Sequence, residues 1–292
     1  MLNSDYAKIE DIMAKFKFRK VLGKVLLYIL TIFIIIVIIF PFYWLVTTSI
    51  KYGIDISATP PIIFPNRFTL ENYITVFNSH IGKYILNSFI VSISTTFLAV
   101  LFGSLASYSL SKTYIGSKIR NAFLIGVLIV RIFPPVVTTM PYYLIITKFG
   151  LYDTQVSMII TYVAYSIPFV MWLMLGFFQE LPSEIDRAAL VDGCNLWQRF
   201  TKITLPLALP GIAVTAIFAY IMAWNEFLYA SVLTSQNAKT LPVLIASYIS
   251  DQRIQFGPMT ATGVLLVIPV LLFSILAQKY LVRGLTFGAV KG

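Results

Sequence analysis

Six apolar runs separated by polar stretches are the feature that most constrains how this chain can fold. The runs are residues 25–50, 83–110, 121–146, 156–178, 207–233 and 258–280. Each is long enough to cross a bilayer as a helix, which takes about 20 residues. Because 58% of the 292 residues are hydrophobic and only 12% are charged, one soluble core could not bury them all. The chain is therefore predicted to be an all-α polytopic membrane protein with six transmembrane helices.

The first apolar run predicts an uncleaved membrane anchor. Residues 1–24 form a polar, basic tail, and the run at 25–50 is too long for a signal-peptide core and lacks a small-residue cleavage site after it. Residues 51–82 are a loop with several proline and asparagine turn signals. The remaining spans lie within 83–280, and residues 281–292 form a second basic tail.

Positive charge predicts which side of the membrane each loop occupies. An even number of spans places both termini on one side. Fifteen Lys and Arg residues lie in or directly beside the two tails, the loop after the second span and the loop at 181–206, whereas six lie in or directly beside the opposite loops. Because cytoplasmic loops are enriched in Lys and Arg, both tails and the 181–206 loop are predicted to be cytoplasmic, and 51–82 extracellular. This asymmetry accounts for the net charge of +10 without a nucleic-acid partner.

The loop at 181–206 is the longest polar interruption in the second half of the chain. Pro182 ends the preceding span, because proline cannot continue a helix. A short helix is predicted over 184–191, with Ser183 and Asp186 as a weak capping box. Asp192-Gly193 predicts its end, since glycine adopts left-handed geometry readily.

A second short helix is predicted to follow this turn. Asn195 and Gln198 have the spacing of a capping box. Leu196, Phe200 and Ile203 recur at i, i+4 and i+7, which places them on one helical face. The pattern predicts a helix–turn–helix held between two membrane spans.

This helix–turn–helix has two interpretations from composition and periodicity alone. Ala188 and Ala189 are small enough for another surface to approach the backbone, while Trp197 and Phe200 are large side chains of the kind enriched at protein interfaces. They favour a docking site for a partner. The alternative is an amphipathic loop that rests on the membrane surface without a partner, and these features do not separate the two.

The spacing of the loop resembles the cytoplasmic "EAA" loop of binding-protein-dependent ABC importer permeases. That signature is Glu-Ala-Ala, three residues, Gly, nine residues and Ile-x-Leu-Pro. Here the matching residues are Arg187-Ala188-Ala189, Gly193, Ile203 and Leu205-Pro206. Arg187 departs from the usual glutamate, and Glu184 or Asp186 is the substitute that the sequence offers. The coupling residues implied by the resemblance are Glu184, Asp186, Arg187, Ala188, Ala189, Asp192, Gly193, Trp197 and Phe200.

The resemblance extends over most of residues 83–292 and is greatest to carbohydrate-uptake permeases of the maltose/trehalose type. These typically carry segments similar to Trp224-Asn225-Glu226-Phe227 and to the tail Arg283-Gly284-Leu285-Thr286 followed by Gly288-Ala289-Val290-Lys291-Gly292. The resemblance implies the type I ABC importer permease fold and a second homologous permease subunit. It also implies two ATPase subunits that bind ATP and Mg²⁺, an extracellular solute-binding protein and a sugar as the cargo.

Two ionisable residues fall inside predicted spans, where charge is costly and usually faces a cavity or a partner. Glu226, with Trp224, Asn225 and Tyr229, is a candidate for the sugar pathway, because carboxylates and amides bind hydroxyls and aromatic faces stack on sugar rings. Contact with another subunit is the alternative. Arg131 is expected to tie carbonyls freed near Pro134-Pro135. The depths of Arg131 and Glu226 differ by about 8–14 Å at 1.5 Å per residue, which does not favour a direct pair.

Other function classes lack the motifs that they need. Gly23-Lys24 and Gly82-Lys83 are not followed by Ser or Thr, so the chain has no phosphate-binding loop. With one cysteine, Cys194, and one histidine, His80, no internal disulfide or cysteine metal cluster is expected, and no cofactor is expected in this chain. A stand-alone carrier would need an internal repeat and coupling-ion sites, and a membrane enzyme would need acid–base pairs. A polyol or glycerol phosphate remains an alternative cargo.

Overall fold

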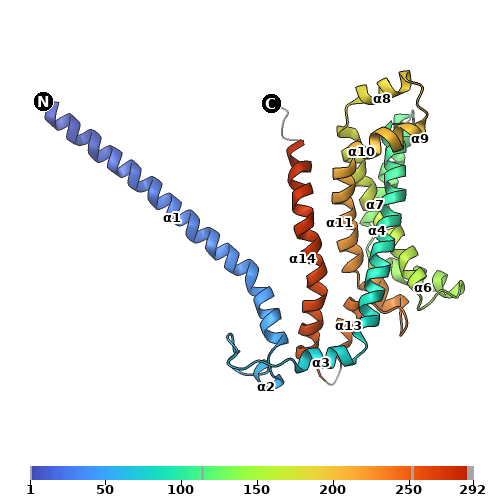
Figure 1. Ribbon diagram of the computed structural model, residues 1–292, viewed down its shortest axis with the longest axis horizontal. Helices are drawn as coiled ribbons and strands as arrows, with labels where there is room; N and C mark the ends of the chain where they lie inside the picture. The colour runs from blue at the N-terminus through green and yellow to red at the C-terminus, as the bar shows by residue number, and fades with distance from the viewer. Residues whose placement is uncertain (1, 113–114, 251–252, 288–292) are drawn as a thin grey trace.

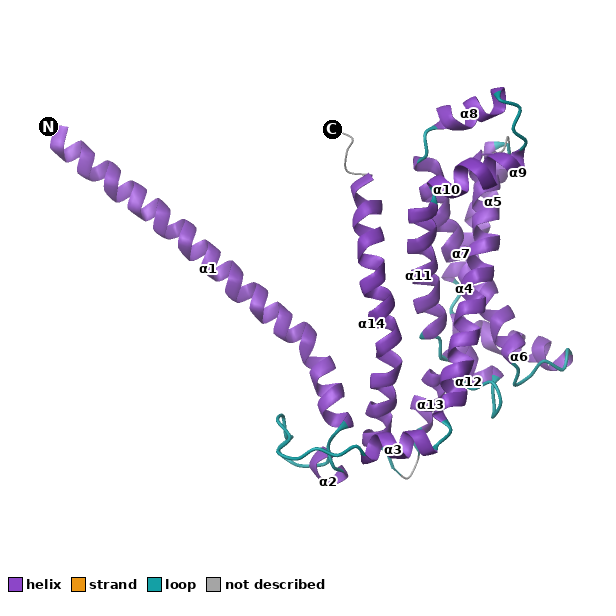
Figure 2. Cartoon of the chain, viewed as in Figure 1, coloured by secondary structure: helices purple, strands orange, loops and turns teal. Residues whose placement is uncertain are grey.

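Helices make up nearly all of the structure, a computed structural model that describes residues 2–112, 115–250 and 253–287 (Figure 2). The elements are α1 (Leu2–Ser49), α2 (Gly53–Ile56), α3 (Glu71–Asn78), α4 (Ile81–Lys112), α5 (Ser117–Ile132), α6 (Pro135–Lys148), α7 (Gln155–Glu180), α8 (Ser183–Val191), α9 (Leu196–Arg199), the π-helix η1 (Phe200–Thr204), α10 (Leu205–Leu207), α11 (Leu209–Trp224), α12 (Leu228–Leu233), α13 (Leu241–Ser247) and α14 (Phe256–Phe287). Within these ranges Ile249 and Ile254 form an isolated β-bridge and no strand occurs. The expected tail residues 288–292 and Asp251 lie outside the described residues.

The described part of the structure contains at most the six membrane spans that the sequence predicts. Within the described ranges, four helical stretches are long and apolar enough to cross a membrane: Lys20–Ser49, Ile81–Ser111, Gln155–Glu180 and Phe256–Leu276. Two bent pairs, Ser117–Ile132 with Pro135–Lys148 and Leu196–Leu207 with Leu209–Trp224, bring the number to six if each pair counts as one span.

The first helix stands away from the others. The expected tail is not a separate segment, because helix α1 runs without a break from Leu2. Its carboxyl-terminal part packs against α14, but its amino-terminal half diverges from the bundle (Figure 1). All the large apolar side chains between Val21 and Phe42 are exposed. This stretch therefore needs lipid or another subunit to cover it.

The centre of the bundle is the contact of α4 with α7 and α11. Serine and threonine side chains of α4 are buried there, among them Ser92, Thr95, Ser104 and Ser107. The Ser107 hydroxyl lies 2.7 Å from the Gly103 carbonyl oxygen and 2.9 Å from that of Met171 on α7. Small and hydroxyl side chains thus let α4 pack closely against α7.

We expect the same glycine-to-alanine change to have opposite effects on two of these helices. A Cβ atom on Gly103 would lie 2.5 Å from Cγ1 of Val170, so Gly103→Ala forces α4 and α7 apart, at a cost of about 1–3 kcal/mol. A Cβ atom on Gly126 of α5 meets nothing within 4 Å, and Gly126→Ala should gain up to about 1 kcal/mol of helix stability. Thermal unfolding in detergent measures both, and an equal shift for the two variants would contradict this packing.

The predicted third span is sharply bent. Phe133 and Pro134 have extended backbones, with ψ of 128° and 127°, because each precedes a proline. Helices α5 and α6 therefore meet at 93°. The prolines were expected to interrupt this span, but residues 121–146 do not form a single crossing helix.

The prediction of a continuous fifth span over 207–233 is wrong. It starts at a second bend of 78° beside Ala208, and helix α11 then ends at Trp224. Residues 225–227 turn the chain before α12 begins at Leu228. This break places Glu226 at the start of a new helix.

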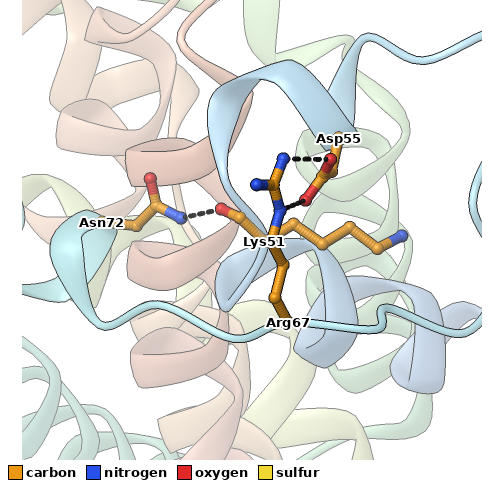
Figure 3. A network of polar contacts seen from close by, with 4 residues as sticks. All are labelled: Lys51, Asp55, Arg67 and Asn72. Carbon is orange, nitrogen blue, oxygen red and sulfur yellow. Dashed lines mark hydrogen bonds and ion pairs between the residues drawn. The ribbon is translucent and has the colours of Figure 1, made fainter.

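Polar contacts fix the segment between α1 and α3 (Figure 3). The Asn72 side chain donates to the carbonyl oxygens of Ser49 and Lys51, each at 2.9 Å, which closes the end of α1. Arg67 donates two hydrogen bonds to the Asp55 carboxylate, at 3.0 and 3.1 Å. Lys51 is buried, its Nζ lies 2.6 Å from the Ile62 carbonyl oxygen, and burial lowers the pKa of its ammonium group. This segment is therefore a folded loop.

The outer loop, residues 234–240, is held by one carboxylate. Asp153 accepts hydrogen bonds from the backbone N–H groups of four residues at 2.9–3.1 Å; these are Ser235, Gln236, Asn237 and Ala238. On the other side, the Asn87 amide donates to the carbonyl oxygens of Asn237 and Lys239. The outer loop is therefore bound to the ends of α4 and α7.

We expect Asp153→Asn to lower the unfolding temperature at neutral pH and to have a smaller effect in acid. Burial raises the pKa of Asp153, but the four N–H donors outweigh it and bring the pKa from 3.8 to about 2. A lowered folded-state pKa stabilises the fold above pH ~4, and this contribution is lost as the pH falls towards 2. After allowance for solvent screening we expect about 1 kcal/mol.

Thermal unfolding of the detergent-solubilised protein between pH 2.5 and 7 tests this prediction. The difference between wild type and Asp153→Asn should shrink below pH ~4. If the difference stayed constant over this range, the carboxylate charge would not be what holds the outer loop.

Candidate functional site

The loop between α7 and α11 forms two short helices at one end of the molecule. Helix α8 follows Pro182, and α9 begins after a turn, as predicted. Figure 1 shows α8 at the same side of the molecule as the amino end of α1 and the carboxyl end of α14.

Specific caps define these two helices. Gly193 has φ of +75°, and the N–H of Cys194 reaches the Ala189 carbonyl oxygen at 3.0 Å, which closes α8 in the left-handed geometry that glycine favours. Asn195 and Gln198 form the predicted reciprocal capping box, at 2.9 and 3.0 Å. The predicted capping role of Ser183 is wrong, because its hydroxyl donates to its neighbour Glu184 instead.

Some residues of the loop at 181–206 are exposed, and others are buried against the rest of the protein. Ala188 is exposed, whereas the adjacent Ala189 is buried. Val191 and Trp197 are 88% and 62% exposed, although both are apolar. Glu184, Arg187, Asp192 and Gly193 are also exposed, and Asp186 is half-buried. An apolar surface held in an otherwise polar loop is typical of a docking site.

Phe200 connects the loop to the membrane helices. It is only 5% exposed, so it is not a docking residue on the outer surface. Its ring lies 4.9 Å from that of Tyr108 on α4, and the Tyr108 ring lies 5.9 Å from Phe178 on α7. The chain adopts a π-helix from Phe200 onward, which alters the simple i, i+4, i+7 face, and Leu196 is exposed. Phe200 therefore attaches the loop to α4 and, through Tyr108, to α7.

The second group of predicted residues lies around the break between α11 and α12. Glu226 accepts hydrogen bonds from the backbone N–H groups of Tyr229 and Ala230, at 2.9 and 3.2 Å. Its carboxylate therefore caps α12, because a negative charge is stabilised at the amino end of a helix. The Asn225 side chain returns to the Ile221 carbonyl oxygen at 2.9 Å. Both side chains support the turn.

Trp224 is part of the packed core. It is 1% exposed, its ring stacks on Tyr220 at 5.7 Å, and its indole N–H donates to the Leu266 carbonyl oxygen at 3.0 Å. Phe89 approaches it edge-on at 4.8 Å. Trp224 thus joins α4, α11 and α14.

Tyr229 faces α6 and α7. Its hydroxyl lies 2.7 Å from Oγ1 of Thr138, and Thr138 donates to the Pro135 carbonyl oxygen at 2.8 Å. Because threonine has a single hydroxyl proton, Tyr229 must be the donor in the first bond. Tyr142 and Tyr165 lie edge-on to the Tyr229 ring, at 5.5 and 5.8 Å.

Arg131 lies beside this tyrosine cluster. Its guanidinium carbon is 5.1 Å from the centre of the Tyr165 ring and 5.6 Å from that of Phe169. Among the described residues it forms no hydrogen bond to a carbonyl group, so its predicted role near the proline break is wrong. It also forms no ion pair with Glu226, in agreement with the difference in depth. Sequence reasoning missed its neighbours Thr138, Tyr142 and Tyr165, which only the bend at Pro134 brings together.

These observations define a class: a polytopic helical membrane protein with a two-helix loop, residues 181–206, anchored to its central helices. Residues 99–287 match the family described as the binding-protein-dependent transport system inner membrane component. The chain belongs to this family. It is an ABC importer permease, a transport subunit rather than an enzyme.

Individual relatives agree with this assignment. The chain is 36% identical over 260 residues to the probable ABC transporter permease protein y4oR of Sinorhizobium fredii, covering 87% of this chain and 91% of that one. It is 34% identical over 279 residues to the trehalose/maltose transport system permease protein MalG of Thermococcus litoralis, covering 94% and 99%.

A solved structure shows the same fold. A chain of a bacterial ABC transporter involved in import of the acidic polysaccharide alginate superposes with a TM-score of 0.73 at 23% identity, covering 89% of this chain and 96% of that one. The type I ABC importer permease fold predicted from the sequence is confirmed.

Proposed function

We propose that the chain is one of two homologous permease subunits of a sugar importer. The cargo class is supported by relatives named for trehalose/maltose and diacetylchitobiose uptake. In the proposed assembly, two ATPase subunits bind ATP and Mg²⁺, and an extracellular solute-binding protein delivers the sugar. This chain itself holds no cofactor. The arrangement of helices about the break at residues 225–227 forms part of the pathway wall.

The proposed orientation places both termini and the α8–α9 loop in the cytoplasm. The excess of Lys and Arg in these segments supports it. The outer loop at 234–240 then faces the extracellular side, together with the segment between α1 and α3.

The proposed mechanism is alternating access driven through the α8–α9 loop. ATP binding closes the ATPase subunits, and the loop moves with them. Because Phe200 packs on Tyr108 and Tyr108 packs on Phe178, this movement reaches α4 and α7, which form the centre of the bundle. Packed interiors move as units rather than deforming smoothly, so α4 and α7 change which side of the membrane the pathway faces.

One observation carries the proposal: the loop is exposed and apolar on its outer side at Val191 and Trp197, yet it is fixed to the core through Phe200. A loop that only rested on the membrane surface would not need the attachment through Phe200. Docking of a partner uses both the exposed apolar surface and this attachment to the core.

Uptake by the reconstituted transporter tests the proposed function. Thermal-shift screening of the cognate solute-binding protein against sugars, polyols and glycerol phosphate first identifies the cargo. Proteoliposomes with both permeases and both ATPases should then accumulate that solute only with ATP and the binding protein. Uptake by this chain alone, driven by a proton or sodium gradient, would instead show a stand-alone carrier.

A further inference from the structure

A small cavity lies where the α5–α6 bend meets α7 and α12. Its volume is about 60 Å³, and its polar lining comes from Arg131, Thr138, Tyr142, Tyr165 and Tyr229. This is room for only a few water molecules, since each needs at least ~10–15 Å³ of such a cavity. It is far below the ~300 Å³ of a pocket that encloses a whole small-molecule ligand. The cavity therefore accepts one chemical group and no complete sugar.

The charge at this cavity has no counter-charge among the described residues. Arg131 is the fifteenth residue of α5, so it lies about 21 Å along the helix from Ser117 at 1.5 Å per residue. A charge at such depth is costly unless it is paired. The carboxylate that sequence reasoning offered as a pathway group, Glu226, instead accepts two backbone N–H groups of α12.

The guanidinium group is held in place but keeps unused donors. The faces of Tyr165 and Phe169 stabilise the cation, by about 0.5–2 kcal/mol for each such contact. Ring faces do not replace hydrogen-bond acceptors. The Nη1 atom of Arg131 is buried and has no hydrogen-bond partner among the described residues. A buried donor without a partner indicates that an acceptor is supplied from outside the chain.

The described residues that line the cavity include no carboxylate that would repel an anion. The Tyr229 proton is directed to Thr138 and the Thr138 proton to Pro135, so these two hydroxyls are fixed. Arginine presents a planar fork of donors that matches carboxylate, sulfate or phosphate oxygens.

We propose that this cavity binds a single acidic group, a carboxylate, sulfonate, sulfate or phosphate, through the Arg131 guanidinium. The group is carried either by the transported solute or by the headgroup of an anionic lipid. The solute source rests on the proposed function and narrows the cargo class to acidic sugars. The lipid source does not depend on the cargo.

Direct binding to the assembled transporter in neutral detergent tests the solute source. Glucuronate and glucose form a matched pair that differs by one carboxylate, and inorganic sulfate is a third probe. We expect glucuronate and sulfate, but not glucose, to raise the unfolding temperature of the complex. Arg131→Gln should weaken glucuronate or sulfate binding at least tenfold, and Arg131→Lys should retain part of it, because lysine keeps the charge and loses the fork. Lys148→Gln, which removes an exposed cation on α6, is the control and should change nothing.

Nanodiscs test the lipid source. Transporter reconstituted in phosphatidylcholine with a minor fraction of phosphatidylglycerol should retain phosphatidylglycerol through purification. This retention should fall at least tenfold in Arg131→Gln and not in Lys148→Gln. If the lipid fills the cavity, phosphatidylglycerol will also compete with glucuronate in the binding assay.

The outcomes separate this inference from the proposed function. Loss of either acidic ligand in Arg131→Gln, with Lys148→Gln unaffected, supports the acidic-group site and identifies its source. If Arg131→Gln does not assemble, the comparison of Arg131→Lys with wild type gives the same answer through a smaller loss. If wild type and both Arg131 variants bound every probe equally, the proposed acidic-group site would be disproved. This would hold even if ATP-driven uptake showed that the protein is part of an importer. Absence of ATP-driven uptake by wild type would overturn the function and leave the lipid result standing.

Discussion

Replacing Ala188 by tryptophan is expected to reduce both ATPase co-purification and ATP-driven uptake by at least about 30-fold. Ala188 is exposed on α8, about one helical turn before the exposed Val191. An indole there would hold a docked surface away from the backbone. Loss of a central contact in an interface typically costs about 2 kcal/mol or more, which corresponds to this factor.

The backbone of the same loop offers a second variant. Gly193 has φ of +75°, and proline requires φ near −65°, so Gly193→Pro cannot keep the turn between α8 and α9. We expect the same loss of docking, because α8 is redirected. Membrane insertion should remain normal, since the spans on either side are unchanged.

Ala122→Trp is the matched control for Ala188→Trp. Ala122 is also an exposed alanine, but it lies on α5, outside the docking loop. This variant should retain co-purification of the ATPases. Wild-type pull-down and uptake in both Ala188→Trp and Gly193→Pro would contradict the docking role of the loop.

The loop at 181–206 was largely predictable because its signals are local. The turn at Gly193 and the capping box of Asn195 depend on residues within a few positions of each other, and both are present in the structure. The direction of Phe200 was not predictable. Its burial depends on Tyr108, which lies on another helix far away in the sequence, and on a π-helix that interrupts the regular period.

The break in the predicted fifth span illustrates why apolar composition is a weak guide to helix ends in a membrane protein. No proline or glycine marks residues 225–227, and the sequence on both sides is apolar. The one local signal is Glu226 three positions before Tyr229, the spacing of a side chain that caps a helix. Recognising it would have placed Glu226 at the amino end of α12 and predicted the break before this helix.

The position of α1 could not be predicted because it depends on surfaces outside the chain. Its apolar residues surround the helix on all sides, which correctly indicates a membrane span but gives no preferred face.

The bend at Pro134 could be predicted only in part, because its angle also depends on packing. Proline predicts an interruption, whereas the angle of 93° depends on how α6 packs against α12.

Trp224→Ala is expected to destabilise the protein by about 3–5 kcal/mol, the usual cost of removing a large buried aromatic side chain. Trp224 is 1% exposed and touches helices on three sides, so its loss leaves a cavity between α4, α11 and α14. Trp224→Phe keeps an aromatic ring but leaves the Leu266 carbonyl oxygen without its donor. That change should cost about 1–3 kcal/mol.

Thermal unfolding in detergent, with sugar protection measured on the same samples, distinguishes this core role from the stacking role suggested by the sequence. Trp172→Ala, which removes a 41% exposed tryptophan from α7, is the control and should shift the unfolding temperature much less. A sugar-stacking residue would lose protection by sugar while keeping its stability. A Trp224→Ala protein as stable as wild type, but no longer protected by the cargo, would therefore place the indole in the pathway and contradict the packing of the core around it.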